Sequence, residues 1–196
     1  MLGDGFHEIP SGKVAMIVTY LEMTSPAPIS TTPLPKDVTF RKVNPDVAWY
    51  RDVFDRVGRN WLWFGRRKLS DEALKAAICD SQVEVYTLSK DGQDEALMEL
   101  DFRQPRACEL AYFGLTQPLI GTGAGRALMN RAITAAWARQ IDRFHVHTCT
   151  IDSQQALAFY LRSGFRPVKL EVEIDDDPRV TGILPSEAAP HVPIIR

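Results

Sequence analysis

The sequence predicts an α+β fold, in which helices pack against a mostly antiparallel sheet. Three observations support this fold class. The chain has 196 residues, of which 45% are hydrophobic, so it can build one substantial core but not two comfortable domains. Three strand-like runs follow one another between residues 83 and 115, and the first two flank Asp91-Gly92, a strong hairpin turn. Helical patterns lie before and after these runs instead of alternating with them.

The first 37 residues are expected to form an N-terminal extension. Residues 13–23 are rich in β-branched side chains, which predicts a strand. Residues 24–37 carry several prolines among serine and threonine, which is typical of a linker.

Residues 38–80 are expected to contain a short strand and two helices. The strand covers residues 38–43, and Pro45 suits the first position of a helix that runs to about Gly58. A second helix starts at Ser70 and ends near Asp80. The first helix is expected to bury Val47, Trp49 or Tyr50, Val53, Phe54 and Val57.

The rest of the chain alternates strands with two further helices. A long helix runs to about Gln140, and a shorter one covers residues 153–164, with Asp152 or Ser153 as its N-cap. Residues 175–196 are expected to form an irregular C-terminal tail. The expected strands are residues 83–89, 95–103, 107–115, 144–150 and 165–174.

Charge and cysteine content narrow the class of protein. The net charge is −2, which gives no reason to expect nucleic acid or a membrane as a partner. Cys79, Cys108 and Cys149 are odd in number and lack C-x-x-C spacing, which argues against a disulfide framework or a zinc cluster. No signal peptide or membrane span is expected, so we expect a cytoplasmic protein.

The segment Gly121-Thr122-Gly123-Ala124-Gly125 lies between a predicted strand and a predicted helix. Main-chain N–H groups in such a turn point one way, and the helix dipole adds positive charge, so the segment predicts a phosphate site. A Walker loop would need Lys-Ser/Thr where this chain has Arg126-Ala127. A Rossmann fingerprint would need its last glycine at Arg126 and an early βαβ unit.

The same segment resembles the pyrophosphate loop of the GNAT superfamily of acyl-CoA-dependent N-acetyltransferases, whose motif is Q/R-x-x-G-x-G/A. Ile120 departs from the first position of this motif, while both small positions match. A second match follows, because the family's helix N-x-x-A-x-x-x-Y and its G-F pair correspond to Ser153, Ala156, Tyr160 and Gly164-Phe165. The resemblance covers residues 38–174, with Ser153 in place of asparagine.

The resemblance implies an α/β/α sandwich with a twisted, mixed and mostly antiparallel sheet. Strands 107–115 and 144–150 are expected to splay apart and hold coenzyme A, with acetyl-CoA as cosubstrate and no metal. Because no clear final strand follows residue 174, strand 13–23 is expected to fill the vacant place in the sheet. A homodimer is common for this fold. The implied coenzyme-binding residues are Leu115, Gly121, Thr122, Gly123, Ala124, Gly125, Arg126 and Ser153.

Two residues are the catalytic candidates. Tyr160 occupies the position of a tyrosine that serves many family members as general acid, with a packed aromatic as the alternative. Glu109 lies six residues before Leu115, the offset at which the histone-acetylating branch keeps its glutamate. Period-two alternation places Glu109 on one strand face with Ala111, Phe113 and Leu115, and its alternative is a solvent-facing carboxylate. Substitutes for Glu109 are Glu99, Asp101, His145 and His147, and the two histidines are more often ordinary strand residues than metal ligands.

The loop after the first helix usually walls the acceptor pocket in this fold. In this chain the loop contains Trp61, Trp63 and Arg66. The two tryptophans are expected to shape an apolar slot, and Arg66 to bind a carboxylate or phosphate of the acceptor. The alternative is that the tryptophans cap the core and the basic residues are solvated. The sequence thus predicts transfer of an acetyl group to a small-molecule or protein primary amine by direct attack in a ternary complex. The alternative function is a non-catalytic coenzyme A-binding module, while nucleic-acid binding rests on too few charges.

Overall fold

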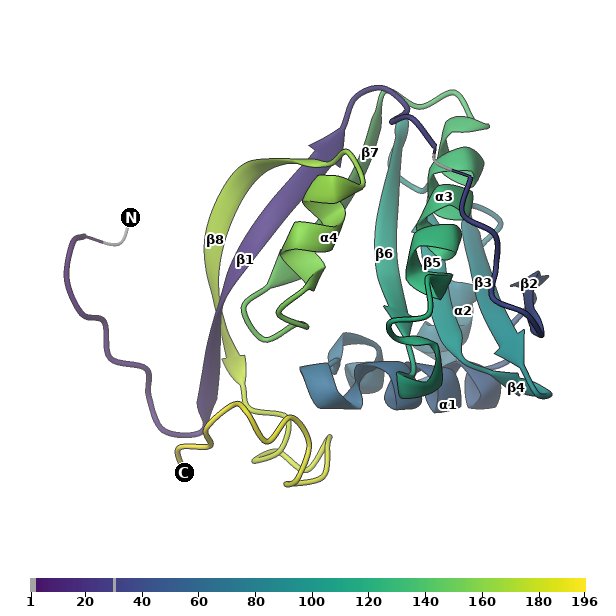
Figure 1. Cartoon of the computed structure of the whole chain (residues 1–196). Helices are drawn as coiled ribbons and strands as arrows, with labels where there is room; N and C mark the ends of the chain where they lie inside the picture. Colours follow the sequence, from purple (N-terminus) through teal and green to yellow (C-terminus); the bar gives the residue numbers. More distant parts are fainter. Residues whose placement is uncertain (1–2, 30) are drawn as a thin grey trace.

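Eight strands form one mixed sheet in the part of the chain that the structure describes, residues 3–29 and 31–196 (Figure 1). The structure is a computed structural model. The strand expected over residues 95–103 is shorter, because the Asp101 carboxylate accepts the N–H of Arg103 at 2.9 Å and turns the chain. The strands are β1 (Lys13–Met23), β2 (Val38–Val43), β3 (Val83–Lys90), β4 (Gln93–Asp94), β5 (Ala96–Asp101), β6 (Ala107–Leu115), β7 (Arg143–Cys149) and β8 (Arg166–Asp176).

The first two helices begin where a side chain, Asp46 or Ser70, accepts one of their first N–H groups. Asp46 caps the first helix and accepts the N–H of Trp49 at 2.8 Å, so the helix begins at Val47 and not at Pro45. The last helix starts three residues later than expected, because the Asp152 carboxylate instead accepts the N–H of Cys149 and closes a turn. The helices are α1 (Val47–Gly58), α2 (Asp71–Ile78), α3 (Ala124–Trp137) and α4 (Ala156–Arg162), with 3₁₀ turns η1 (Arg59–Trp61), η2 (Gly65–Lys68) and η3 (Gln117–Leu119).

The sheet has the order β2-β3-β5-β6-β7-β1-β8, and β4 extends the β3 edge. Neighbouring strands pair antiparallel except for β6 and β7, which are parallel. The prediction of a mixed, mostly antiparallel sheet is therefore confirmed.

Helices cover both faces of the sheet. One face packs against α1 and α2 through residues such as Val53, Phe54 and Leu97. The other face packs against α3 and α4 through residues such as Leu128, Phe144 and Tyr160. In Figure 1, α3 and α4 lie in front of the sheet.

Strand β1 enters the sheet between β7 and β8, the place that the sequence analysis expected for it. It is antiparallel to both neighbours, so Tyr20 stands opposite His147 on β7 and opposite Lys169 on β8. The first strand of the chain therefore joins the last strand to the rest of the sheet.

Residues 177–196 contain neither helix nor strand, yet they fold around one buried cation. Arg179 pairs with Asp177 at 2.7 Å, and both side chains are almost fully buried. The guanidinium also donates to the carbonyl oxygens of Ala188, Ala189 and Val192. Leu184 and its neighbours then pack against β1.

Replacing Leu21 with alanine tests whether β1 is part of the folded core. Leu21 is completely buried, so Leu21→Ala is expected to lower the free energy of unfolding by about 2–5 kcal/mol, as measured by urea denaturation. Ile17, on the same strand, is 49% exposed, and Ile17→Ala should cost much less. Equal costs would contradict a central position for β1.

Candidate active site

Strands β6 and β7 pair only at their first residues. The parallel ladder joins Ala107 to Arg143, Cys108 to Phe144 and Glu109 to His145. Beyond these pairs β6 stays bonded to β5, and β7 stays bonded to β1, so the two strands separate (Figure 1). The expected splayed pair is therefore present, and it leaves one edge of β6 with unpaired main-chain groups.

The N–H of Leu115 points into this gap. The next N–H, of Thr116, donates to the carbonyl of Glu95 at 3.0 Å, on the β5 side. Because successive N–H groups of a strand point to opposite sides, that of Leu115 faces away from β5. It is a free donor at the place where β6 ends.

The glycine segment forms an open loop between η3 and α3. Gly121 and Gly123 have φ of +79° and +90°, which glycine adopts without strain. A Cβ at either position would meet nothing within 4 Å, so the loop surface is open. Gly123 is the N-cap of α3 and supplies no capping side chain; the N–H of Ala124 donates to the Thr122 hydroxyl at 3.4 Å, so the N–H groups of Gly125 and Arg126 are the ones that the helix end can offer to an anion.

Three predicted coenzyme contacts, Arg126, Ser153 and Thr122, have side chains that form hydrogen bonds within the protein. The Arg126 guanidinium donates to the hydroxyl of Ser163 at 3.0 Å and lies over the ring of Phe159, so its side chain is held against α4. Ser153 precedes α4, and its hydroxyl donates to the side chain of Gln155 at 2.7 Å. Thr122 is fixed by a hydrogen bond from its hydroxyl to the carbonyl of Leu119 at 2.8 Å.

Tyr160 lies among aromatic rings on the α3 and α4 face of the sheet. Phe113, Phe159 and Phe165 surround it in edge-on contacts. Burial, with the nearby charge of Asp152, raises the pKa of its hydroxyl well above the ordinary value. The hydroxyl therefore stays protonated across the neutral range and can act as a donor.

Glu109 lies on the opposite face of the sheet, which corrects the predicted alternation. Glu109 pairs with Asp101 and Tyr112 pairs with Glu99, so a bulge inserts Ala111 between them. The extra residue reverses the alternation, and Phe113 and Leu115 turn to the α3 and α4 face while Glu109 faces away from it. A simple period of two cannot detect such a bulge.

Glu109 faces His147 across the gap. Its carboxylate oxygen Oε1 lies 3.6 Å from Nδ1 of His147, a distance within ion-pair range. The interaction raises the pKa of His147 above its ordinary value and lowers that of Glu109. Burial lowers the pKa of the neighbouring His145, and its Nε2 atom is buried without a partner in the described residues.

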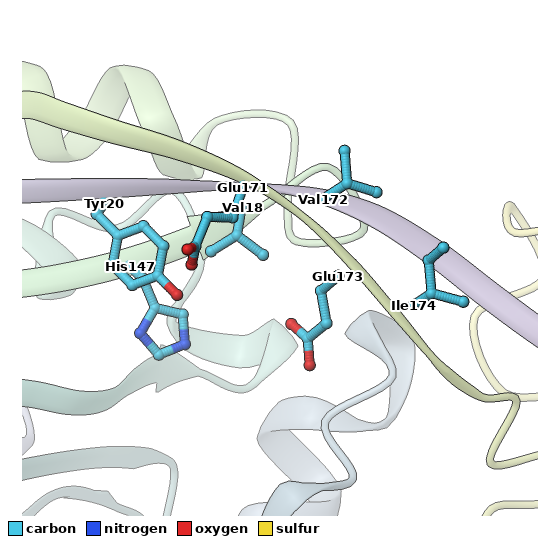
Figure 2. Close-up of a pocket in the computed structure, with 7 residues that line it drawn as sticks. All are labelled: Val18, Tyr20, His147, Glu171, Val172, Glu173 and Ile174. Atoms are coloured by element: carbon cyan, nitrogen blue, oxygen red, sulfur yellow. The ribbon is translucent and has the colours of Figure 1, made fainter. Parts of the chain in front are cut away.

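A cleft of about 650 Å³ opens beside His147, between β7, β1 and β8 (Figure 2). Tyr20, Glu171 and Glu173 line it, and the ring of Tyr20 lies 5.7 Å from that of His147. The sequence analysis missed these three residues, because the pairing that assembles them joins strands at opposite ends of the chain. A smaller hollow, of about 350 Å³, adjoins Glu109 on the other side and is lined by Asp101, Arg103 and Gln104.

Arg66 is bound to a buried carboxylate. Its guanidinium pairs with Glu99, which is completely buried and also accepts the hydroxyl of Tyr50 at 2.5 Å. The Arg66 guanidinium also lies over the ring of Tyr112. Burial raises the pKa of the Tyr112 hydroxyl to about 12. Arg66 and Glu99 therefore form an ion pair with each other.

The two loop tryptophans differ in their surroundings. Trp63 packs on Phe54 and Tyr112, and its Nε1 donates to Asp152 at 3.3 Å. Trp61 is half-buried and lies edge-on to His191 of the C-terminal residues.

In residues 3–29 and 31–196, no helix is long and apolar enough to cross a membrane. The same residues contain no cluster of three or more histidine, cysteine or acidic side chains that would suit a metal ion.

Residues 59–165 match the family model described as the acetyltransferase (GNAT) family, and they make up more than half of the chain. No curated protein matches the chain.

Solved structures agree in fold. A GCN5-related N-acetyltransferase from Sphaerobacter thermophilus superposes with a TM-score of 0.62 at 15% identity, over 83% of this chain and 52% of its own. A GCN5-related N-acetyltransferase from Kribbella flavida superposes with a TM-score of 0.54 at 17% identity. The match covers 85% of this chain and 60% of the Kribbella protein. A GNAT family acetyltransferase from Elizabethkingia anophelis, solved with acetyl-CoA bound, superposes with a TM-score of 0.53 at 15% identity. The match covers 69% of this chain and 80% of the Elizabethkingia protein. The chain spans about half the length of the Sphaerobacter protein, and identities this low establish the fold alone.

Replacing Arg66 with methionine tests the buried pair. Arg66→Met leaves Glu99 buried without its cation, so the free energy of unfolding should fall by about 3–5 kcal/mol in urea denaturation. Arg59 is exposed on the neighbouring turn, and Arg59→Met should change stability by less than about 0.5 kcal/mol. A stable Arg66→Met protein with a raised KM for its acceptor would instead support the predicted substrate contact.

Proposed function

Because the chain belongs to the GNAT acetyltransferase family, we propose that it transfers an acetyl group from acetyl-CoA to a primary amine by direct attack in a ternary complex. The observation that carries the proposal is the gap between β6 and β7, which has Tyr160 on one face of the sheet and Glu109 and His147 on the other. An acyl thioester in this gap would meet a proton donor on one side and a proton acceptor on the other.

Coenzyme A is proposed to lie with its diphosphate on the glycine loop. The N–H groups of Gly125 and Arg126, in the first turn of α3, point out of the helix end, and the positive φ of Gly121 and Gly123 shapes the open turn before it. The amide-rich pantetheine arm would then complete the unpaired edge of β6. Bound acetyl-CoA supplies an activated acyl group, and the chain positions it.

The reaction forms one C–N bond and breaks one C–S bond. The amine attacks the thioester carbon from the face that carries Glu109, and the N–H of Leu115 donates to the developing oxyanion. The nitrogen loses one proton on that face, and the leaving thiolate gains one on the other. Tyr160 is the proposed donor to the thiolate, since its hydroxyl is kept protonated by burial.

The alternative is a coenzyme A-binding module without catalysis. A module of this kind needs the glycine loop but has no use for an acid and a base on opposite faces of the gap. Release of free thiol from acetyl-CoA in the presence of a panel of primary amines separates the two functions.

The compartment and the acceptor are also proposals. Cys79, Cys108 and Cys149 are all free, which supports the cytoplasm. The acceptor is a small-molecule or protein amine, and the residue set of the acceptor pocket is proposed to include Trp61 at the rim.

Replacing Gly123 with alanine tests the glycine loop. The φ of +90° is strained for alanine, so the loop should shift and the affinity for acetyl-CoA, measured by calorimetry, should fall about tenfold. Gly92 provides a matched control in the hairpin after β3, with φ of +79° and no atom near its Cβ position. Gly92→Ala should lose comparable stability and keep its affinity. If the wild-type protein has no measurable affinity for acetyl-CoA, the proposed function is wrong.

Replacing Tyr160 with phenylalanine tests the acid. The ring contacts survive in Tyr160→Phe, so acetyl-CoA affinity should hold while kcat for thiol release falls by about 10²-fold or more. Tyr86→Phe removes another partly buried hydroxyl, which donates to Glu84, and should leave kcat unchanged. An unchanged kcat in Tyr160→Phe would show a purely structural aromatic.

A further inference from the structure

His147 and Glu109 are the two groups that meet on the amine side of the gap, and their surroundings differ. Glu109 faces the ring nitrogen Nδ1 of His147 at 3.6 Å. The other ring nitrogen, Nε2, lies on the opposite side of the imidazole. Because Glu109 faces Nδ1, Nε2 is the ring nitrogen left to a molecule in the cleft that His147 lines.

The ring of His147 borders the larger cleft, whereas Glu109 does not line it. Figure 2 shows the imidazole beside Tyr20, with Glu171 and Glu173 on the neighbouring strand of the same hollow. The side chain of His147 is 48% exposed, and that of Glu109 is 34% exposed. A molecule in this cleft therefore reaches His147 before it reaches Glu109.

Position along the strands supports the same assignment. His145 is the last residue of β7 that pairs with β6, and His147 is the next residue on that face. Its imidazole thus stands where the gap begins to open.

We propose that His147 is the catalytic base that takes the proton from the acceptor amine, and that Glu109 is a positioning residue that orients its imidazole. This assignment rests on the proposed acetyltransferase function, and it gives the role of base to a residue that the sequence analysis named only as a substitute for Glu109. The acceptor then enters through the cleft between β7, β1 and β8.

The proton balance is complete with groups already in place. The amine nitrogen gives one proton to Nε2 of His147 as the C–N bond forms, and the imidazolium is stabilised by the Glu109 carboxylate. The thiolate takes one proton on the Tyr160 side as the C–S bond breaks. Exchange with solvent then removes the proton from His147 through the open cleft and returns one proton to the Tyr160 phenolate, so both groups regain their starting forms.

The charged and titratable groups that face His147 come from four elements. They are Glu109 on β6, His145 on β7, Tyr20 on β1, and Glu171 and Glu173 on β8, with Asp152 after β7. Glu109 is the largest influence and raises the pKa of His147. The neutral base is therefore lost as the pH falls through a value above the ordinary histidine pKa.

The test combines NMR titration with kinetics on the full chain. The probes are acetyl-CoA with spermidine, a lysine-containing peptide and a dipeptide with a free α-amine. In the wild-type protein, kcat/KM should fall with decreasing pH along the titration curve of the His147 imidazole. His147→Gln should lower kcat by about 10²–10⁴-fold and remove that dependence.

Glu109→Gln distinguishes the two roles. This variant removes the carboxylate but leaves the imidazole. The pKa of His147 measured by NMR should therefore fall, and the acidic limb of the plot of kcat/KM against pH should move to lower pH with it. The loss in kcat should be tenfold or less. A loss as large as that of His147→Gln, with no shift of the limb, would make Glu109 the base and overturn the proposal. A loss confined to His145→Gln would overturn it as well.

The dependence on the acceptor gives a second readout. At pH 7 roughly one lysine-type amine in 2,500 is neutral, against about one α-amine in ten. His147→Gln should therefore slow the lysine peptide more than the dipeptide, and His7→Gln, at an exposed N-terminal position, should slow neither. If no probe releases thiol from the wild-type protein, the proposed function fails, and the shift of the His147 pKa in Glu109→Gln still reports whether the two side chains are paired.

Discussion

The separation of β6 from β7 is the constraint on which the rest of the structure depends. Two parallel strands that start side by side would normally continue their ladder, because unpaired main-chain groups inside a protein are costly. Here β6 is hydrogen-bonded to β5 on its other edge, and β7 is hydrogen-bonded to β1 on its other edge. The two halves of the sheet diverge between β6 and β7. The gap therefore follows from the strand pairing itself, and beyond Glu109 the edge of β6 that faces it has no partner strand.

The gap gives the two faces of the sheet different chemistry. On the α3 and α4 face, aromatic rings enclose the hydroxyl of Tyr160, and burial favours its neutral form. On the other face, the carboxylate of Glu109 favours the protonated form of His147. The bulge at Ala111 decides this distribution, because it sends Glu109 and Phe113 to opposite faces of one strand. The hydroxyl of Tyr160 and the Glu109–His147 pair therefore lie on opposite faces of the sheet.

The acceptor side is made rigid by a buried ion pair and by the first strand of the chain. Glu99 binds both Arg66, in the segment that joins α1 to α2, and Tyr50 on α1, so this segment is anchored to strand β5. Strand β1 carries Tyr20 to the cleft and ties β8 to the sheet. The ends of the chain therefore complete a site whose centre lies in the middle of the sequence.

The sequence by itself determined the fold class, most strand positions and the glycine loop, because these depend on local pattern: alternation, turn residues and helix caps. It also placed the residues 13–23 strand in the sheet, from a vacancy in the expected order. Only the tertiary structure decided the face of Glu109, the pairing of Arg66 with Glu99 and the cleft of Tyr20, Glu171 and Glu173. A bulge, a buried charge pair and the register between distant strands depend on contacts far apart in sequence, and local periodicity carries no information about them.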